Sequence, residues 1–172
     1  MHLIKLISFF TLLSVLTGCL EDLKPASKDL RSGDTPTSEN FIALTTLNAT
    51  VTLENELLNN DAVVLYFTMW CPLCDSHMSH MRSEIIDNYR NVSFYMVDYV
   101  SANLAQSLSS QRSNGYAGLQ LLVDNQQSLL NQYNATMASV VVIDDQKKIL
   151  LNEDYKNGAR LINILDNLGG EQ

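Results

Sequence analysis

Apolar and polar positions follow two different periods along this chain, and those periods predict strands and helices. The segment 62–67 is apolar on both faces, which predicts a central parallel strand covered on both sides. Apolar side chains then recur at helical spacing, which predicts a helix over 75–89 that buries Cys74, Met78, Met81 and Ile85. Further strands are expected at 41–44, 51–53, 92–98, 119–123, 139–143 and 147–151, and further helices at 54–60, 102–112, 125–133 and 157–168. This order predicts an α/β sandwich with a mixed central sheet flanked by helices.

The first residues of the chain have the pattern of an export signal. Lys5 is the only firm charge, an apolar run covers 6–16, and Leu-Thr-Gly precedes Cys19. The run is shorter than the roughly 20 residues that a permanent membrane span needs. Leu-Thr-Gly-Cys resembles a bacterial lipobox, in which the cysteine becomes the lipid-modified first residue. We therefore expect 1–18 to be a lipoprotein signal peptide and Cys19 the lipidation site, with an ordinary signal peptide as the alternative.

Composition changes after Cys19. Residues 19–40 are polar and rich in Ser, Thr, Pro, Asp and Lys, as is typical of a flexible tether, whereas 41–172 is long enough for one domain. A formal net charge of −8 excludes a basic nucleic-acid surface and argues against electrostatic adhesion to anionic lipid. The expected location is the bacterial cell envelope, with the domain lipid-anchored and facing the periplasm. Leu20 lacks the aspartate that often retains lipoproteins in the inner membrane, so the outer membrane is modestly favoured.

A Cys-x-x-Cys pair lies between the central strand and the helix that follows it. Cys71 would lie at the positive end of the helix dipole, which favours the nucleophilic thiolate. Cys74 would lie one turn deeper, close enough to attack a mixed disulfide formed on Cys71. With Cys19 lipidated, these two cysteines remain to pair in an oxidising compartment. A purely structural disulfide is the alternative, although so short a loop contributes little stability.

The string Trp70-Cys71-Pro72-Leu73-Cys74 and the order of elements resemble the thioredoxin superfamily over 41–168. The likeness is closer to exported thiol–disulfide oxidoreductases of the TlpA/ResA/DsbE type. Segments 41–53, 121–133 and 141–144 resemble that group's N-terminal hairpin, inserted strand–helix and final core strand. The resemblance implies a thioredoxin-like sandwich and a redox-active Cys71–Cys74 disulfide that exchanges with a protein substrate. A second redox protein would recycle the pair, no bound organic cofactor is implied, and the working form would be the dithiol reductant, although the sequence leaves the direction open.

Two departures from the family pattern affect the expected site. The cis-proline that usually precedes the last core strand is replaced by Ala138, next to Met137, so we expect a trans peptide or a reshaped loop. The aspartate that lies beneath the cysteines in thioredoxins corresponds to Leu65. Proton transfer to or from Cys74 would then need another group or water. Trp70 is expected to pack beside the sulfurs and cover them, and Pro72 to restrict the first helical turn.

The residues around the pair leave alternatives open. His77 and His80 are either solvated helix positions or imidazolium groups that favour the Cys71 thiolate. Methionines 69, 78, 81 and 137 are either core filling or part of a soft site, in which Cys71, Cys74, His77 and Met78 would hold copper(I) for delivery. Asp98 either approaches the site or caps a turn.

Two further functions remain open at this point. Thr68-x-x-Cys71 resembles the peroxiredoxin threonine and peroxide-reacting cysteine, but Val64 stands where that pattern has a proline. A peroxidase is therefore a less favoured alternative. The replacement of the cis-proline by Ala138 also leaves room for a thioredoxin-like binding module without turnover.

Overall fold

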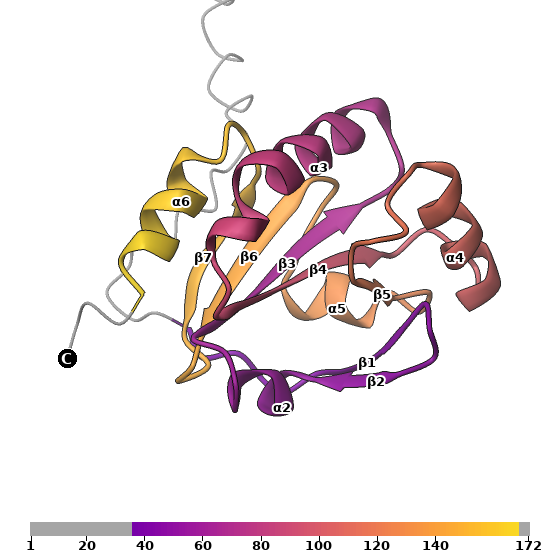
Figure 1. Ribbon diagram of the computed structural model, residues 1–172. Helices are drawn as coiled ribbons and strands as arrows, with labels where there is room; N and C mark the ends of the chain where they lie inside the picture. Colours follow the sequence, from indigo (N-terminus) through magenta and orange to yellow (C-terminus); the bar gives the residue numbers. More distant parts are fainter. Residues whose placement is uncertain (1–35, 169–172) are drawn as a thin grey trace, which may run out of the picture.

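The computed structural model describes residues 36–168, and these form a single mixed sheet between helices (Figure 1). The strands are β1 (Ile42–Thr45), β2 (Thr50–Thr52), β3 (Ala62–Thr68), β4 (Val92–Asp98), β5 (Leu121–Val123), β6 (Ser139–Asp144) and β7 (Ile149–Asp154). Their order across the sheet is β2-β1-β5-β4-β3-β6-β7. Strands β3, β4 and β5 are parallel to one another, whereas the other pairings are antiparallel.

Helices cover both faces of this sheet. They are α2 (Leu53–Leu57), α3 (Pro72–Glu84), the 3-10 helix η1 (Ile86–Asn88), α4 (Leu104–Ser113), α5 (Ser128–Gln132) and α6 (Ala159–Asp166). In Figure 1, α3 and α6 lie above one face and α5 lies below the other. No helix between residues 36 and 168 is long and apolar enough to cross a bilayer.

All seven residues of β3 are buried, because each face of the strand enters a different core. Val63, Leu65 and Phe67 pack in one cluster with Leu53 at the start of α2 and Leu129 of α5. The alternate residues Val64 and Tyr66 pack in the other cluster with Met78 and Met81 of α3 and Leu161 of α6. Successive side chains of a strand point to opposite faces, so an all-apolar run suits a strand between two helical layers.

The fold class and the predicted strands and helices are confirmed, and the main difference lies at the ends of α3. The helix begins at Pro72, before the predicted 75, because Cys71 caps it. Backbone angles of φ −122° and ψ −59° at Ile85 end the helix, and η1 replaces the predicted last turn. The buried stripe is as predicted: Cys74, Met78, Met81 and Ile85 are each 3% exposed or less.

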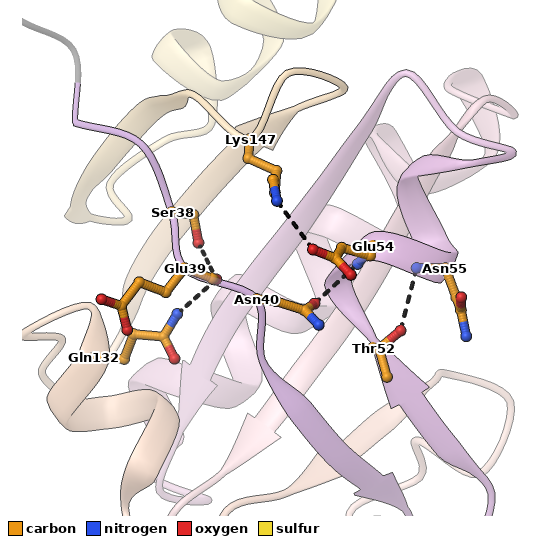
Figure 2. Close-up of polar contacts among 8 residues, drawn as sticks. All are labelled: Ser38, Glu39, Asn40, Thr52, Glu54, Asn55, Gln132 and Lys147. Carbon is orange, nitrogen blue, oxygen red and sulfur yellow. Dashed lines mark hydrogen bonds and ion pairs between the residues drawn. The ribbon is translucent and has the colours of Figure 1, made fainter.

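Residues 36–40, predicted as the end of a flexible tether, belong to the folded domain. The Ser38 N–H donates to the carbonyl oxygen of Lys147 over 2.6 Å, and the Ser38 hydroxyl contacts the Tyr133 hydroxyl over 2.8 Å. Figure 2 shows the next two residues held by Gln132 and Glu54, which donate to the Glu39 carbonyl and the Asn40 side chain. The predicted signal peptide, Cys19 and the rest of the tether lie outside the described residues.

Candidate active site

The chain makes a sharp turn between β3 and α3 and so presents Cys71 at the start of a helix. Trp70 adopts a left-handed conformation, with φ 59°, and its N–H donates to the Thr68 hydroxyl over 3.2 Å. Cys71 is the N-cap of α3, and its Sγ accepts the N–H of Cys74 over 3.2 Å. Pro72 follows at the first helical position, where its missing N–H leaves no donor unpaired. Cys71 therefore lies at the start of a helix, as the sequence predicts.

The two sulfurs differ in accessibility. Cys71 is partly exposed, whereas Cys74 is 1% exposed, and both are free thiols. A partner's disulfide therefore reaches Cys71 first, while Cys74 can act only from within. This difference in exposure suits Cys71 to attack a partner and Cys74 to resolve the mixed disulfide.

Ionisation of the pair differs from the sequence-based expectation of a Cys71 thiolate. Burial raises the pKa of Cys71, and a hydrogen bond with the Cys74 side chain raises it further. Burial also opposes ionisation of Cys74, but hydrogen bonds from the Cys71 side chain, nearby backbone and the Thr68 hydroxyl outweigh it and lower the pKa of Cys74. In the dithiol, the negative charge is therefore favoured on Cys74. Since the sulfurs share the remaining proton, its passage to Cys74 makes Cys71 the nucleophile.

The loop before β6 faces the pair, as the resemblance implies. Within residues 36–168 no peptide bond is cis, so the trans peptide expected at Ala138 is confirmed. Ala138 has φ 65°, and its backbone is fully engaged: its N–H donates to Phe67, and its carbonyl accepts from Tyr155. The neighbouring Met137 is 38% exposed, and its Sδ lies 3.6 Å from Cys71 Sγ. Met69 and Leu73 are also exposed beside the accessible sulfur.

His77 lies behind the pair, in a cluster of ring side chains that the sequence did not predict. It is only 7% exposed, and its Nδ1 lies 3.0 Å from the Tyr66 hydroxyl. Its ring also packs against Tyr155, with 4.8 Å between the centroids, and the Tyr155 hydroxyl bonds Nδ1 of His80 over 2.5 Å. The only sequence signal for the cluster was a tyrosine at position 66 in an otherwise apolar strand.

Both sequence-based interpretations of His77 are wrong. The side chain is not solvated, and burial lowers its pKa, so the ring is favoured in its neutral form and supplies no positive charge to Cys71. Two members of the alternative copper(I) ligand set, His77 and Met78, have other contacts in the structure. The imidazole is engaged by Tyr66, and Met78 is 3% exposed within the apolar cluster under α3. Among the described residues, no group of three or more His, Cys, Asp or Glu side chains converges on one point.

Asp98 and Thr68 lie side by side at the ends of β4 and β3. One oxygen of Asp98 accepts the N–H groups of Val100 and Ser101, each over 3.1 Å, which is the turn-capping role. The other oxygen is buried without a hydrogen-bond partner among the described residues. The Thr68 hydroxyl accepts the Trp70 N–H and lowers the pKa of Cys74, the buried sulfur, although the peroxiredoxin pattern would associate it with Cys71.

The sheet order, the capped cysteine and the facing loop define a thioredoxin-like oxidoreductase. A profile described as the AhpC/TSA family matches residues 37–151, and the chain belongs to that family. No sequence in the curated set of proteins matches the chain.

Solved structures with low sequence identity share the fold. A candidate protein disulfide isomerase from Bacteroides thetaiotaomicron superposes with a TM-score of 0.66 at 21% identity, covering 82% of this chain and 92% of that one. A candidate DsbE-type thiol:disulfide interchange protein from Chlorobium tepidum gives 0.66 at 19% identity, covering 80% and 100%. The exposed lipoprotein thioredoxin Etrx1 from Streptococcus pneumoniae gives 0.60 at 20% identity, covering 76% and 100%.

Proposed function

We propose that this protein is a membrane-anchored thiol–disulfide oxidoreductase that reduces protein disulfides through Cys71 and Cys74. The observation that carries the proposal is the unequal exposure of two free thiols at the start of α3. The Cys71 thiolate attacks the partner's disulfide, which breaks, and one partner sulfur leaves as a thiolate that takes up a proton. Cys74 then attacks Cys71, the Cys71–Cys74 bond forms and the second partner sulfur leaves. Two electrons have passed from the pair to the partner.

The proposed location and partners follow from the sequence and the family resemblance. The lipobox-like segment before Cys19 supports a lipid anchor in the bacterial envelope, and one structural neighbour is itself described as an exposed lipoprotein. The exposed apolar side chains of Met69, Leu73 and Met137 beside Cys71 suit contact with a partner protein. A second dithiol protein would return the oxidised pair to its reduced form.

Reduction of insulin disulfides by the full chain tests the proposal. With dithiothreitol as the electron source, we expect turnover that Cys71→Ser abolishes. When the reduced Cys74→Ser chain is mixed with insulin in the absence of dithiothreitol, it should instead accumulate a covalent mixed disulfide, visible by mass spectrometry, because no second thiol then resolves the bond on Cys71. Equal rates for the unmodified chain and Cys71→Ser would refute the enzyme and leave a binding module.

A peroxidase is the second candidate, since the chain belongs to the AhpC/TSA family. The effect of Thr68 argues against it, because its hydroxyl lowers the pKa of the buried Cys74 and not that of the accessible Cys71. Hydrogen peroxide consumption by the reduced chain distinguishes the two functions. Disulfide exchange predicts that Cys71 reacts with peroxide no faster than free cysteine does, and a much faster reaction would favour the peroxidase.

A further inference from the structure

Cys74 must lose its proton while Cys71 is joined to the partner. At that stage the surroundings of Cys74 stabilise its thiolate less than they do in the dithiol. In the dithiol, the Cys71 side chain is one of the donors that favour the Cys74 thiolate. Once Cys71 is joined to a partner's sulfur, it has no proton to donate to Cys74. Burial disfavours the Cys74 thiolate, and fewer hydrogen bonds then offset that effect. Leu65, at the position of the family's buried acid, is 0% exposed in the apolar cluster on the other side of the sheet and offers no base.

Tyr66 and His77 supply a connected path from this sulfur. The Cys74 thiol interacts with the Tyr66 side chain and helps to raise its pKa, and the Tyr66 hydroxyl lies 3.0 Å from His77 Nδ1. Tyr66 is 2% exposed and held edge-on against the rings of His77 and Tyr155, with 6.1 Å between the centroids of each pair. A phenol can accept one proton while it donates another, so the sulfur, the hydroxyl and the imidazole can act in sequence.

We propose that Tyr66 and His77 form a proton relay that takes the thiol proton of Cys74 while Cys74 resolves the mixed disulfide on Cys71. The inference rests on the proposed disulfide exchange. The Cys74 S–H bond breaks, and its proton passes to the Tyr66 oxygen as the hydroxyl proton passes to His77 Nδ1. The Cys74–Cys71 bond forms, and the partner's sulfur leaves with the electron pair of the broken disulfide. The protonated His77 returns a proton to water from its other nitrogen.

The ionisation states of the two groups suit a relay in which the transfers occur together. Burial raises the pKa of Tyr66 strongly, so a free tyrosinate is not an intermediate. Burial lowers the pKa of His77, so near neutral pH its ring is available as an acceptor.

Several other titratable groups face the relay. Cys71 and Tyr155 act on Tyr66, His80 acts on His77, and Tyr99 lies near Cys74 and Asp98. His80 is bonded to Tyr155 and not to Tyr66. The interactions of Tyr66 therefore connect Cys74 to His77.

A two-phase reaction with Ellman's reagent isolates the relay step. The full chain carrying Cys19→Ser, so that two thiols remain, is reduced and mixed with the reagent in detergent solution. The first phase, whose rate depends on reagent concentration, labels Cys71. The second is a unimolecular release by Cys74, and its leaving group departs as a thiolate that needs no proton.

We expect Tyr66→Phe to slow the second phase at least about tenfold at neutral pH while changing the first less than twofold. The second-phase rate of the parent chain should be nearly flat between about pH 6.5 and 8, because neutral His77 is the base. The rate in Tyr66→Phe should rise with pH and approach that of the parent in alkali, where Cys74 ionises unaided. His77→Asn keeps an acceptor for the tyrosine but not a base, and should give the same pH dependence.

Tyr133→Phe is the matched control, since it removes the hydroxyl of a buried tyrosine on the opposite face of the sheet. It should leave both phases and the pH profile unchanged. Parent-like second-phase rates in both Tyr66→Phe and His77→Asn would overturn the relay alone. The absence of a second phase in the parent chain would overturn the disulfide exchange and the relay together.

Discussion

Along β3, Val63, Leu65 and Phe67 enter a core that contains residues of α2 and α5, whereas Val64 and Tyr66 enter the core beneath α3 and α6. The first set is wholly apolar. The second includes Tyr66, whose hydroxyl lies 3.0 Å from His77 Nδ1 and whose side chain interacts with Cys74. One position along a strand therefore separates a side chain that only packs from one that can handle protons.

The largest effect is expected from placing the family's acid at its usual position. Leu65→Asp puts a carboxyl group into a fully buried apolar cluster without a partner, which should lower the free energy of unfolding by at least about 3 kcal/mol. Urea unfolding followed by circular dichroism measures the change. Leu65→Met, which conserves volume, should cost less than about 1.5 kcal/mol. A stable Leu65→Asp protein with faster disulfide resolution would break the proposed contrast between the faces.

A smaller effect is expected from Tyr66→Phe, which removes a hydroxyl but no apolar volume. The lost hydrogen bond to His77 should lower the free energy of unfolding by about 1 kcal/mol, and Tyr133→Phe, which loses its bond to Ser38, by about as much. Urea unfolding of both variants measures the comparison. If the two variants are equally stable but only Tyr66→Phe resolves the mixed disulfide slowly, the difference between the two faces lies in chemistry and not in folding.

The stability of the α3 face should also depend on pH. Burial lowers the pKa of His77 in the folded protein, so below about pH 6.5 the unfolded chain binds more protons. Stability should therefore be fully present at pH 7.5 and fall as the pH drops below about 6.5 toward the folded value. The measurement is the urea midpoint of unfolding at pH 7.5 and at a pH below about 6.5. The difference between the two midpoints should be smaller in His77→Asn than in the parent chain. An equal pH effect in both proteins would contradict the buried, neutral imidazole.

The smallest effect is expected on the polar edge of the α2 face. Glu54 pairs with Lys147 over 3.0 Å, and both side chains are well exposed (Figure 2). Glu54→Gln should change the free energy of unfolding by no more than about 0.5 kcal/mol, and salt should reduce the difference. Urea unfolding at low and high sodium chloride checks this. A large loss would mean that polar contacts, and not apolar packing, stabilise this face.

The sequence was sufficient for features that depend on local pattern. The all-apolar strand, the helical stripe from Cys74 to Ile85 and the trans peptide at Ala138 follow from spacing and from the identity of single residues. The resemblance also placed Met137 next to the cysteines, and its sulfur lies beside Cys71.

Features that depend on contacts distant in the chain could not be predicted. His77 is buried because Tyr66 and Tyr155, from a strand and from the segment after β7, close around it. Its helical position alone gave no sign of that burial. The charge distribution in the pair also depends on tertiary contacts, since Thr68 and nearby backbone favour the Cys74 thiolate. A helix dipole considered alone assigned the charge to Cys71.

The pairing of Ser38 with Lys147 holds the beginning of the described chain far from the two cysteines. Lys147 lies in the turn between β6 and β7, at the end of the sheet where Ala62 opposes Asp144. The cysteines follow Thr68, at the other end of β3 and about 20 Å away along the strand. The lipid anchor proposed at Cys19 would therefore attach to the domain at the end opposite the cysteines. A partner protein would then reach Cys71 from the side away from that anchor.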